Sequence, residues 1–177
     1  LKSGMLSPFY LDLRLLVSHP LLLKKIAREL AVKTRDIQFD RLAAVPYAAI
    51  PIATALSLEI NKPLVYSRKE AKDYGTKKIV EGAFKSGETA LVIDDLITTG
   101  LSKFEAIAPL TQAGLVVRDV LVIVDREQGG REQLAGIGLH LHSLYTITEI
   151  MRELREKSEL SSEVFNTAMD FIKNNKA

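Results

Sequence analysis

Apolar runs of strand length alternate with helical patterns along this chain, and the alternation constrains the fold more than any other feature of the sequence. Strands buried on both faces form continuous apolar runs, and helical crossovers between such strands produce a parallel sheet. The predicted fold class is therefore α/β, with a central, mostly parallel sheet and helices on both faces. We expect strands at residues 42–45, 63–66, 90–93, 120–124 and 138–144, and helices at residues 19–30, 50–58, 102–114, 146–157 and 161–173.

Length and composition restrict the organisation and the partners. A chain of 177 residues suits a single domain with a substantial core. The absence of cysteine excludes a disulfide framework and a cysteine nucleophile, and it is compatible with a cytoplasmic location. Acids and bases are interspersed and the net charge is +2, so we expect no nucleic-acid-binding face and no membrane anchor. The expected partner is a small molecule.

The segment from residue 90 to residue 102 carries the strongest functional signal. An apolar strand leads into two adjacent carboxylates, and a turn rich in hydroxyl groups then opens a helix. In an open parallel sheet, ligands bind beyond the carboxyl ends of the strands, where this turn would lie. Hydroxyl donors, a glycine and the amides that open a helix all favour a bound anion. The turn consists of Thr98, Thr99, Gly100, Leu101 and Ser102.

The acidic pair, Asp94 and Asp95, indicates what lies beside that anion. Ionised carboxylates only accept hydrogen bonds, and two neighbouring ribose hydroxyls are matching donors. The segment thus predicts a site for a ribose that carries a phosphate. It contains neither a Walker A loop nor a Gly-x-Gly-x-x-Gly fingerprint. An isolated acidic pair is usually just solvated, but here the whole segment agrees with one kind of site.

This segment resembles the phosphoribosyl-pyrophosphate (PRPP) signature of the type I phosphoribosyltransferases. The resemblance implies that Asp94 and Asp95 hold the ribose hydroxyls, with Asp95 among the catalytic residues, and that residues 98–102 hold the 5-phosphate. It also implies a small hood, formed by the N-terminal segment, above the sheet.

Other segments resemble one branch of that family, the orotate phosphoribosyltransferases. They are residues 1–4, 7–10, 68–75 and 125–130, so the similarity spans nearly the whole chain. Residues 45–51 and 73–77 are more similar to the version that is fused to orotidylate decarboxylase in uridine monophosphate synthases. The resemblance implies Mg²⁺-dependent transfer of the phosphoribosyl group from PRPP to orotate, which gives orotidine 5′-monophosphate and pyrophosphate in pyrimidine biosynthesis.

A charged stretch at residues 67–82 is by itself typical of a solvated loop. The resemblance instead implies a mobile catalytic lid, in which one lysine enters the partner subunit's site, so a homodimer is implied. It also implies that Mg²⁺ is held mainly by PRPP, with no direct protein ligand. The residues implied to contact PRPP from this lid are Arg68, Lys69, Lys72 and Tyr74, with Tyr47 from another loop; Lys69 and Lys72 are the implied catalytic lysines.

Orotate carries a carboxylate, and Arg126 follows a predicted strand where its guanidinium could hold that group at two points. The alternative is an ion pair with Asp125 or Glu127, and the residues alone favour this alternative because surface ion pairs are common. The resemblance assigns Arg126 to orotate. It adds Lys2, Phe9, Tyr10 and Thr98 to the same contact set.

The chain departs from the bacterial pattern at two positions. Tyr74 stands where many bacterial relatives have a histidine, and Ala48 stands where they often have a phosphate-binding lysine. Both differences match the fused subgroup. We also expect an N-terminal helix to be missing from this sequence and a C-terminal helix at residues 160–174.

Two other functions stay open on the sequence. One is PRPP-dependent transfer to a purine or to uracil, for which Arg126 would be dispensable because those bases carry no carboxylate. The other is a regulator that senses PRPP without turning it over, although such a regulator would need a basic face or a DNA-binding module, and neither is evident here.

Overall fold

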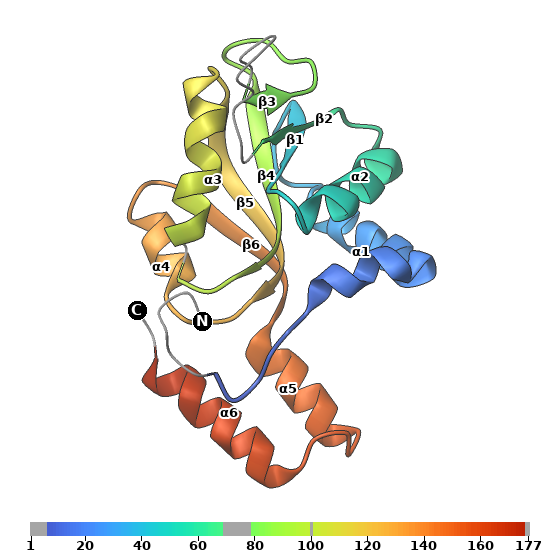
Figure 1. Cartoon of the computed structure of the whole chain (residues 1–177), viewed down its shortest axis with the longest axis vertical. Helices are drawn as coiled ribbons and strands as arrows, with labels where there is room; N and C mark the ends of the chain where they lie inside the picture. The colour runs from blue at the N-terminus through green and yellow to red at the C-terminus, as the bar shows by residue number, and fades with distance from the viewer. Residues whose placement is uncertain (1–6, 69–78, 100, 176–177) are drawn as a thin grey trace.

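The computed structural model of the chain describes residues 7–68, 79–99 and 101–175, with the side chains of residues 101–103 left out. Within these ranges the strands form a six-stranded sheet in the order β3-β2-β1-β4-β5-β6 (Figure 1). All neighbouring strands are parallel except β3, which is antiparallel to β2. The strands are β1 (Arg41–Ala44), β2 (Leu64–Ser67), β3 (Val80–Glu81), β4 (Thr89–Ile97), β5 (Val116–Asp125) and β6 (His140–Thr146).

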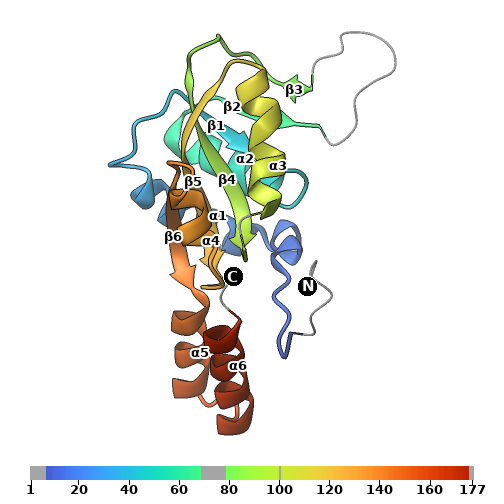
Figure 2. The same ribbon diagram turned by 90° about the vertical axis from the view of Figure 1, so that its left-hand side faces the viewer.

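Helices cover both faces of the sheet, as Figures 1 and 2 show, and the predicted α/β class is confirmed. The helices α1 (Pro20–Lys33) and α2 (Ala49–Ile60) lie on one face, and α3 (Leu101–Gln112) and α4 (Gly130–Ala135) lie on the other. Successive side chains of β4 point to opposite faces of the sheet. Leu91 packs in the hydrophobic cluster under α2, and Val92 packs in the hydrophobic cluster under α3. No helix in the described ranges is long and apolar enough to cross a membrane.

A helical hairpin extends from the carboxyl end of β6 (Figure 2). It consists of α5 (Ile147–Glu156) and α6 (Ser162–Asn174), and the latter confirms the expected C-terminal helix. A capping box between Thr146 and Glu149 begins α5. The N-terminal segment runs beside this hairpin into the 3-10 helix η1 (Leu13–Ser18), and the rings of Phe9 and Phe171 meet edge to face at 6.2 Å. The hood thus includes the hairpin as well as the predicted N-terminal segment.

Several boundaries differ from the expected ones. Strand β4 was expected to end at residue 93, before the acids, but it continues to Ile97 and contains both of them. The cause is pairing with β5, because the ladder joins Asp94 to Val122 and Ile97 to Asp125, beyond the apolar run. The short elements η1, β3 and α4 were not expected, since none is long enough to show a clear period.

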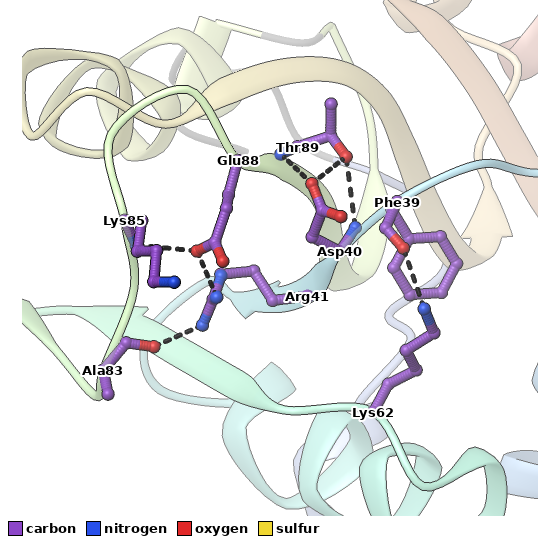
Figure 3. A network of polar contacts seen from close by, with 8 residues as sticks. All are labelled: Phe39, Asp40, Arg41, Lys62, Ala83, Lys85, Glu88 and Thr89. Carbon is purple, nitrogen blue, oxygen red and sulfur yellow. Dashed lines mark hydrogen bonds and ion pairs between the residues drawn. The ribbon is translucent and has the colours of Figure 1, made fainter.

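Polar contacts tie the loops together at the amino ends of β1 and β4 (Figure 3). The buried Arg41 side chain donates to the carbonyl of Ala83 and pairs with Glu88. The Glu88 carboxylate also accepts from the Lys85 amide at 2.7 Å. This network lies at the end of the sheet opposite to Asp94 and Asp95, so it supports the fold without entering their site.

Asp40, in the same network, gives the fold a testable pH dependence. Hydrogen bonds from the amide and the hydroxyl of Thr89, at 2.7 and 2.8 Å, hold the pKa of Asp40 below its ordinary value of 3.8. A carboxyl group whose pKa is lowered by folding stabilises the native state above its unfolded pKa, and this contribution is lost as the pH falls through the folded pKa. An Asp40→Ala variant should therefore melt below the native chain at about pH 7, and the difference should shrink at about pH 3.

Thermal unfolding followed by circular dichroism at both pH values measures this difference. Asp36→Ala, which removes an exposed acid close by in the sequence, is the matched control and should leave the melting temperature nearly unchanged. A difference for Asp40→Ala that is equally large at both pH values would contradict the assignment.

Candidate active site

A cavity of about 790 Å³ opens at the carboxyl ends of the parallel strands, where the sequence predicted the site. Segments distant in the sequence contribute its walls: the N-terminal segment, the loop after β1, the end of β2, the end of β4 and the residue after β5. The polar side chains that line it are Tyr10, Asp12, Arg14, Tyr47, Ser67, Arg68, Asp94, Asp95, Thr98, Glu105 and Arg126.

Both members of the acidic pair lie in the cavity wall. Asp94 is buried, and its Oδ1 accepts a hydrogen bond from the Asp95 amide at 2.8 Å. The Asp95 Oδ1 accepts one from the Leu96 amide at 2.8 Å. These local bonds orient the carboxylates, which act only as hydrogen-bond acceptors when ionised. The predicted role as acceptors for a sugar diol is chemically compatible with this geometry.

The turn after β4 has the predicted strand, loop and helix order. Thr98 lines the cavity, and α3 begins at Leu101, so the last two residues of the turn are also the first two of this 12-residue helix. Helix amino ends attract anions through their free amides and the positive end of the dipole. Gly100 lies outside the described residues, as do the side chains of Leu101 and Ser102, while Thr99 is not among the cavity-lining residues.

Arg126 is the most informative side chain in the cavity. It is 6% exposed, and its Nη2 donates to the Ser7 hydroxyl at 3.1 Å. Its guanidinium carbon lies 4.8 Å from the centre of the Phe9 ring, a cation–π arrangement. Burial lowers the pKa of Arg126. Within the described part of the chain its Nε has no hydrogen-bond partner, and a buried donor without a partner calls for an explanation.

The alternative ion pair for Arg126 does not form. Asp125 accepts the Glu127 amide at 2.8 Å and pairs with Arg131 at 3.2 Å. The Glu127 carboxylate accepts the Thr148 amide at 2.9 Å. Across residues 7–68, 79–99 and 101–175, the ion pairs of the structure include none for Arg126. The interpretation that the residues alone favoured is therefore wrong, because both neighbouring acids have other partners in the structure.

Sequence reasoning missed the Asp12–Arg14 pair in the N-terminal wall. The Arg14 Nε lies 2.7 Å from Asp12 Oδ1, and its Nη2 donates to the Tyr10 hydroxyl at 2.6 Å. The hydrogen bond with Asp12 raises the pKa of Arg14, and the charge of Asp95 adds to this effect. The alternation of Tyr10, Asp12 and Arg14 with Leu11 and Leu13 was the available signal. Glu105, on α3, also lines the cavity and left no signal in the sequence.

The remaining predicted residues divide into two groups. Arg68 and Tyr47 line the cavity, and the Arg68 Nη1 lies 3.3 Å from the Glu81 carboxylate, across the β2–β3 pair. Ala48 also lines it. Lys2, Lys69, Lys72 and Tyr74 lie outside the described residues, so their predicted roles stay predictions.

A divalent metal is part of the expected chemistry. The described side chains include no group of three or more His, Cys, Asp and Glu that could enclose a metal ion. Mg²⁺ is commonly bound by one or two carboxylates together with substrate oxygens rather than by an all-protein cage. The hard oxygen donors of Asp94 and Asp95 in the cavity wall fit that kind of site.

Comparison with known proteins gives a consistent result, although no family model matches the chain. The chain is 40% identical to uridine 5′-monophosphate synthase of Bos taurus over 177 residues, which are 99% of this chain but 37% of that protein. It is 39% identical to orotate phosphoribosyltransferase of Pyrococcus furiosus over 165 residues, covering 92% of this chain and 88% of that protein.

A solved structure agrees over almost the whole chain. The structure of Leishmania donovani UMP synthase superposes with a TM-score of 0.93 at 40% identity, and the match covers 98% of this chain and 38% of that one. The chain therefore spans less than two fifths of each of these synthases.

Proposed function

Because the chain belongs to the orotate phosphoribosyltransferase family, we propose that it transfers the 5-phosphoribosyl group from PRPP to orotate, giving orotidine 5′-monophosphate and pyrophosphate. The reaction would serve pyrimidine biosynthesis. The observation that carries the proposal is Arg126, a buried guanidinium without a carboxylate partner in the described chain, in the same cavity as the acidic pair. The cysteine-free sequence is compatible with a cytoplasmic location, which stays a prediction.

The cavity walls suggest how the two substrates are arranged. Asp94 and Asp95 would accept the ribose hydroxyls, and the turn from Thr98 into α3 would bind the 5-phosphate. Arg126 would bind the orotate carboxylate at two points, held in place by Ser7 and Phe9. Tyr10 would contact the base from the N-terminal wall.

Catalysis under this proposal depends on position and charge. Breaking the bond from the anomeric carbon to pyrophosphate leaves positive charge on the sugar and negative charge on the leaving group. Asp94 and Asp95 lie where the ribose would bind, and their carboxylates favour positive charge there. Arg68, with Lys69 and Lys72 as predicted from the sequence, would favour the negative charge of the pyrophosphate. Mg²⁺, held mainly by PRPP oxygens as the resemblance implies, would neutralise part of the same charge when bound.

We also propose that the chain works as a homodimer that shares a lid lysine between subunits. The surface at η1 and the start of α1 supports a partner, since Leu15, Val17 and Leu21 are 61%, 57% and 79% exposed. Adjacent exposed apolar side chains of this size often mark an interface between proteins.

Subunit complementation tests the shared lysine. Consider a heterodimer of one Lys72→Ala chain and one Asp95→Asn chain. If Lys72 crosses the interface, the site of the Lys72→Ala chain keeps its own Asp95 and receives a native Lys72, so it is intact. The other site then carries both defects. With different affinity tags on the two chains, the purified heterodimer should then show about half of the native activity per dimer. Each homodimer alone serves as the inactive control. A heterodimer no more active than the homodimers would place Lys72 in its own subunit's site.

The proposed reaction is tested by mixing the purified chain with PRPP, Mg²⁺ and orotate and following orotate absorbance. Uracil, hypoxanthine and adenine are tested in parallel through pyrophosphate release. Loss of orotate alone would support the proposal. Turnover of another base would move the assignment to a different phosphoribosyltransferase, and calorimetric binding of PRPP without turnover of any base would favour the PRPP-sensing regulator.

A further inference from the structure

Gly130, at the start of α4, lies against the beginning of the phosphate-binding turn. A Cβ atom at this position would sit 2.7 Å from the Thr98 carbonyl oxygen and 2.7 Å from Cγ1 of Ile97. Contacts that short do not occur with a real Cβ, and one of them is to backbone. The φ of Gly130 is not positive, so its backbone conformation does not require glycine. The space available does, because any Cβ would collide with these atoms.

The turn from Arg126 to Gly130 cannot simply move away from Thr98. The Arg126 amide donates to the Ile97 carbonyl at 3.0 Å. Arg131, the residue after Gly130, pairs with Asp125 at 3.2 Å and donates to the Leu141 carbonyl of β6 at 2.7 Å. Leu134 of α4 is fully buried in the core. These contacts hold α4 in place, so an added methyl group would displace the Thr98 turn relative to Arg126.

We infer that Gly130 is a positioning residue that sets the separation between the phosphate-binding turn and the base-binding Arg126. The inference rests on the proposed function, because it assigns the two sides of the contact to PRPP and to orotate. Its chemical consequence is specific. The anomeric carbon and the attacking nitrogen of the base must meet in one geometry, and a misplacement of 1 Å can cost on the order of 100-fold in rate.

Gly130→Ala tests this role, with Gly136→Ala as the matched control. Gly136 ends the same helix, has an ordinary helical backbone, and a Cβ there would lie 3.4 Å from its nearest neighbour, the Gln133 carbonyl. We expect Gly130→Ala to lower kcat by about tenfold or more, because the two substrates are misaligned. The KM of each substrate and the calorimetric Kd of PRPP should change by less than about threefold, since each half of the site stays intact.

The control should match the native chain in every constant. A Gly130→Ala variant with native kcat would overturn the inference. So would one whose PRPP Kd rises as much as kcat falls, because that pattern indicates local damage to the turn. If the native chain turns over no base at all, the proposed function fails independently of Gly130.

Hydrogen exchange on the native chain tests the same contact without a substitution, and it applies even if Gly130→Ala does not fold. Binding of PRPP at the Thr98 turn should slow the exchange of amides in residues 129–135, which that ligand does not itself contact under the proposed arrangement. Unchanged exchange in this segment at saturating PRPP would overturn the inference.

Discussion

Arg126→Ala is expected to lower kcat/KM for orotate by roughly 100- to 1,000-fold, since truncating one partner of a buried charge pair typically costs about 2–5 kcal/mol. The physical reason is the environment of the guanidinium. It is already desolvated, held by Ser7 and Phe9, and without a carboxylate partner in the described chain. The expected loss concerns orotate, so the Kd of PRPP measured by calorimetry should change little.

Two further variants separate charge from shape at this position. Arg126→Lys keeps the positive charge but lacks the planar fork, so it should recover only a small part of the activity. Arg118→Ala removes an arginine from the other end of β5 and should behave like the native chain. Steady-state rates with orotate measure all three. If Arg126→Ala turns over orotate as the native chain does, the carboxylate-binding role is wrong and a base without a carboxylate becomes the better substrate.

Replacing both Asp94 and Asp95 by asparagine should weaken PRPP binding by about 100-fold, because hydrogen bonds to charged acceptors contribute about 1.5–3 kcal/mol and those to neutral acceptors about 1 kcal/mol. Asparagine retains the Oδ1 that accepts the Asp95 and Leu96 amides, so the local fold of the strand end should persist. The loss should therefore report the missing charges rather than a displaced backbone.

Isothermal titration calorimetry with PRPP and Mg²⁺ measures this loss. Asp119→Asn, which changes a carboxylate that contacts His142 at 2.7 Å near the other end of β5, is the matched control. Native PRPP affinity in the double variant would contradict the assignment of the pair to the ribose. A lower melting temperature with the same affinity loss in Asp119→Asn would show that the effect is general.

The sequence by itself determined the fold class and the position of the acidic pair and of the turn after it, for which phosphate binding stays a prediction. Periodicity is a local property, and the longer apolar runs revealed their strands and helices, whereas the short η1, β3 and α4 escaped it. The acidic pair and the hydroxyl-rich turn are contiguous from residue 94 to residue 102, so their order along the chain already placed them at the end of one strand. The resemblance to a known family added the substrates and the lid, whose lysines the described structure does not test.

Only the tertiary structure decided the surroundings of Arg126. The Arg126 guanidinium meets Ser7, 119 positions away in the chain, and the competing acids beside it are engaged by Arg131 and by the Thr148 amide. The same is true of Arg14 in the N-terminal segment, which lines the same cavity as Asp95 of β4. Gly130 lies against Thr98 because β4 and β5 are neighbours. Strand order and long-range packing create these contacts, and neither is encoded in a local pattern of residues.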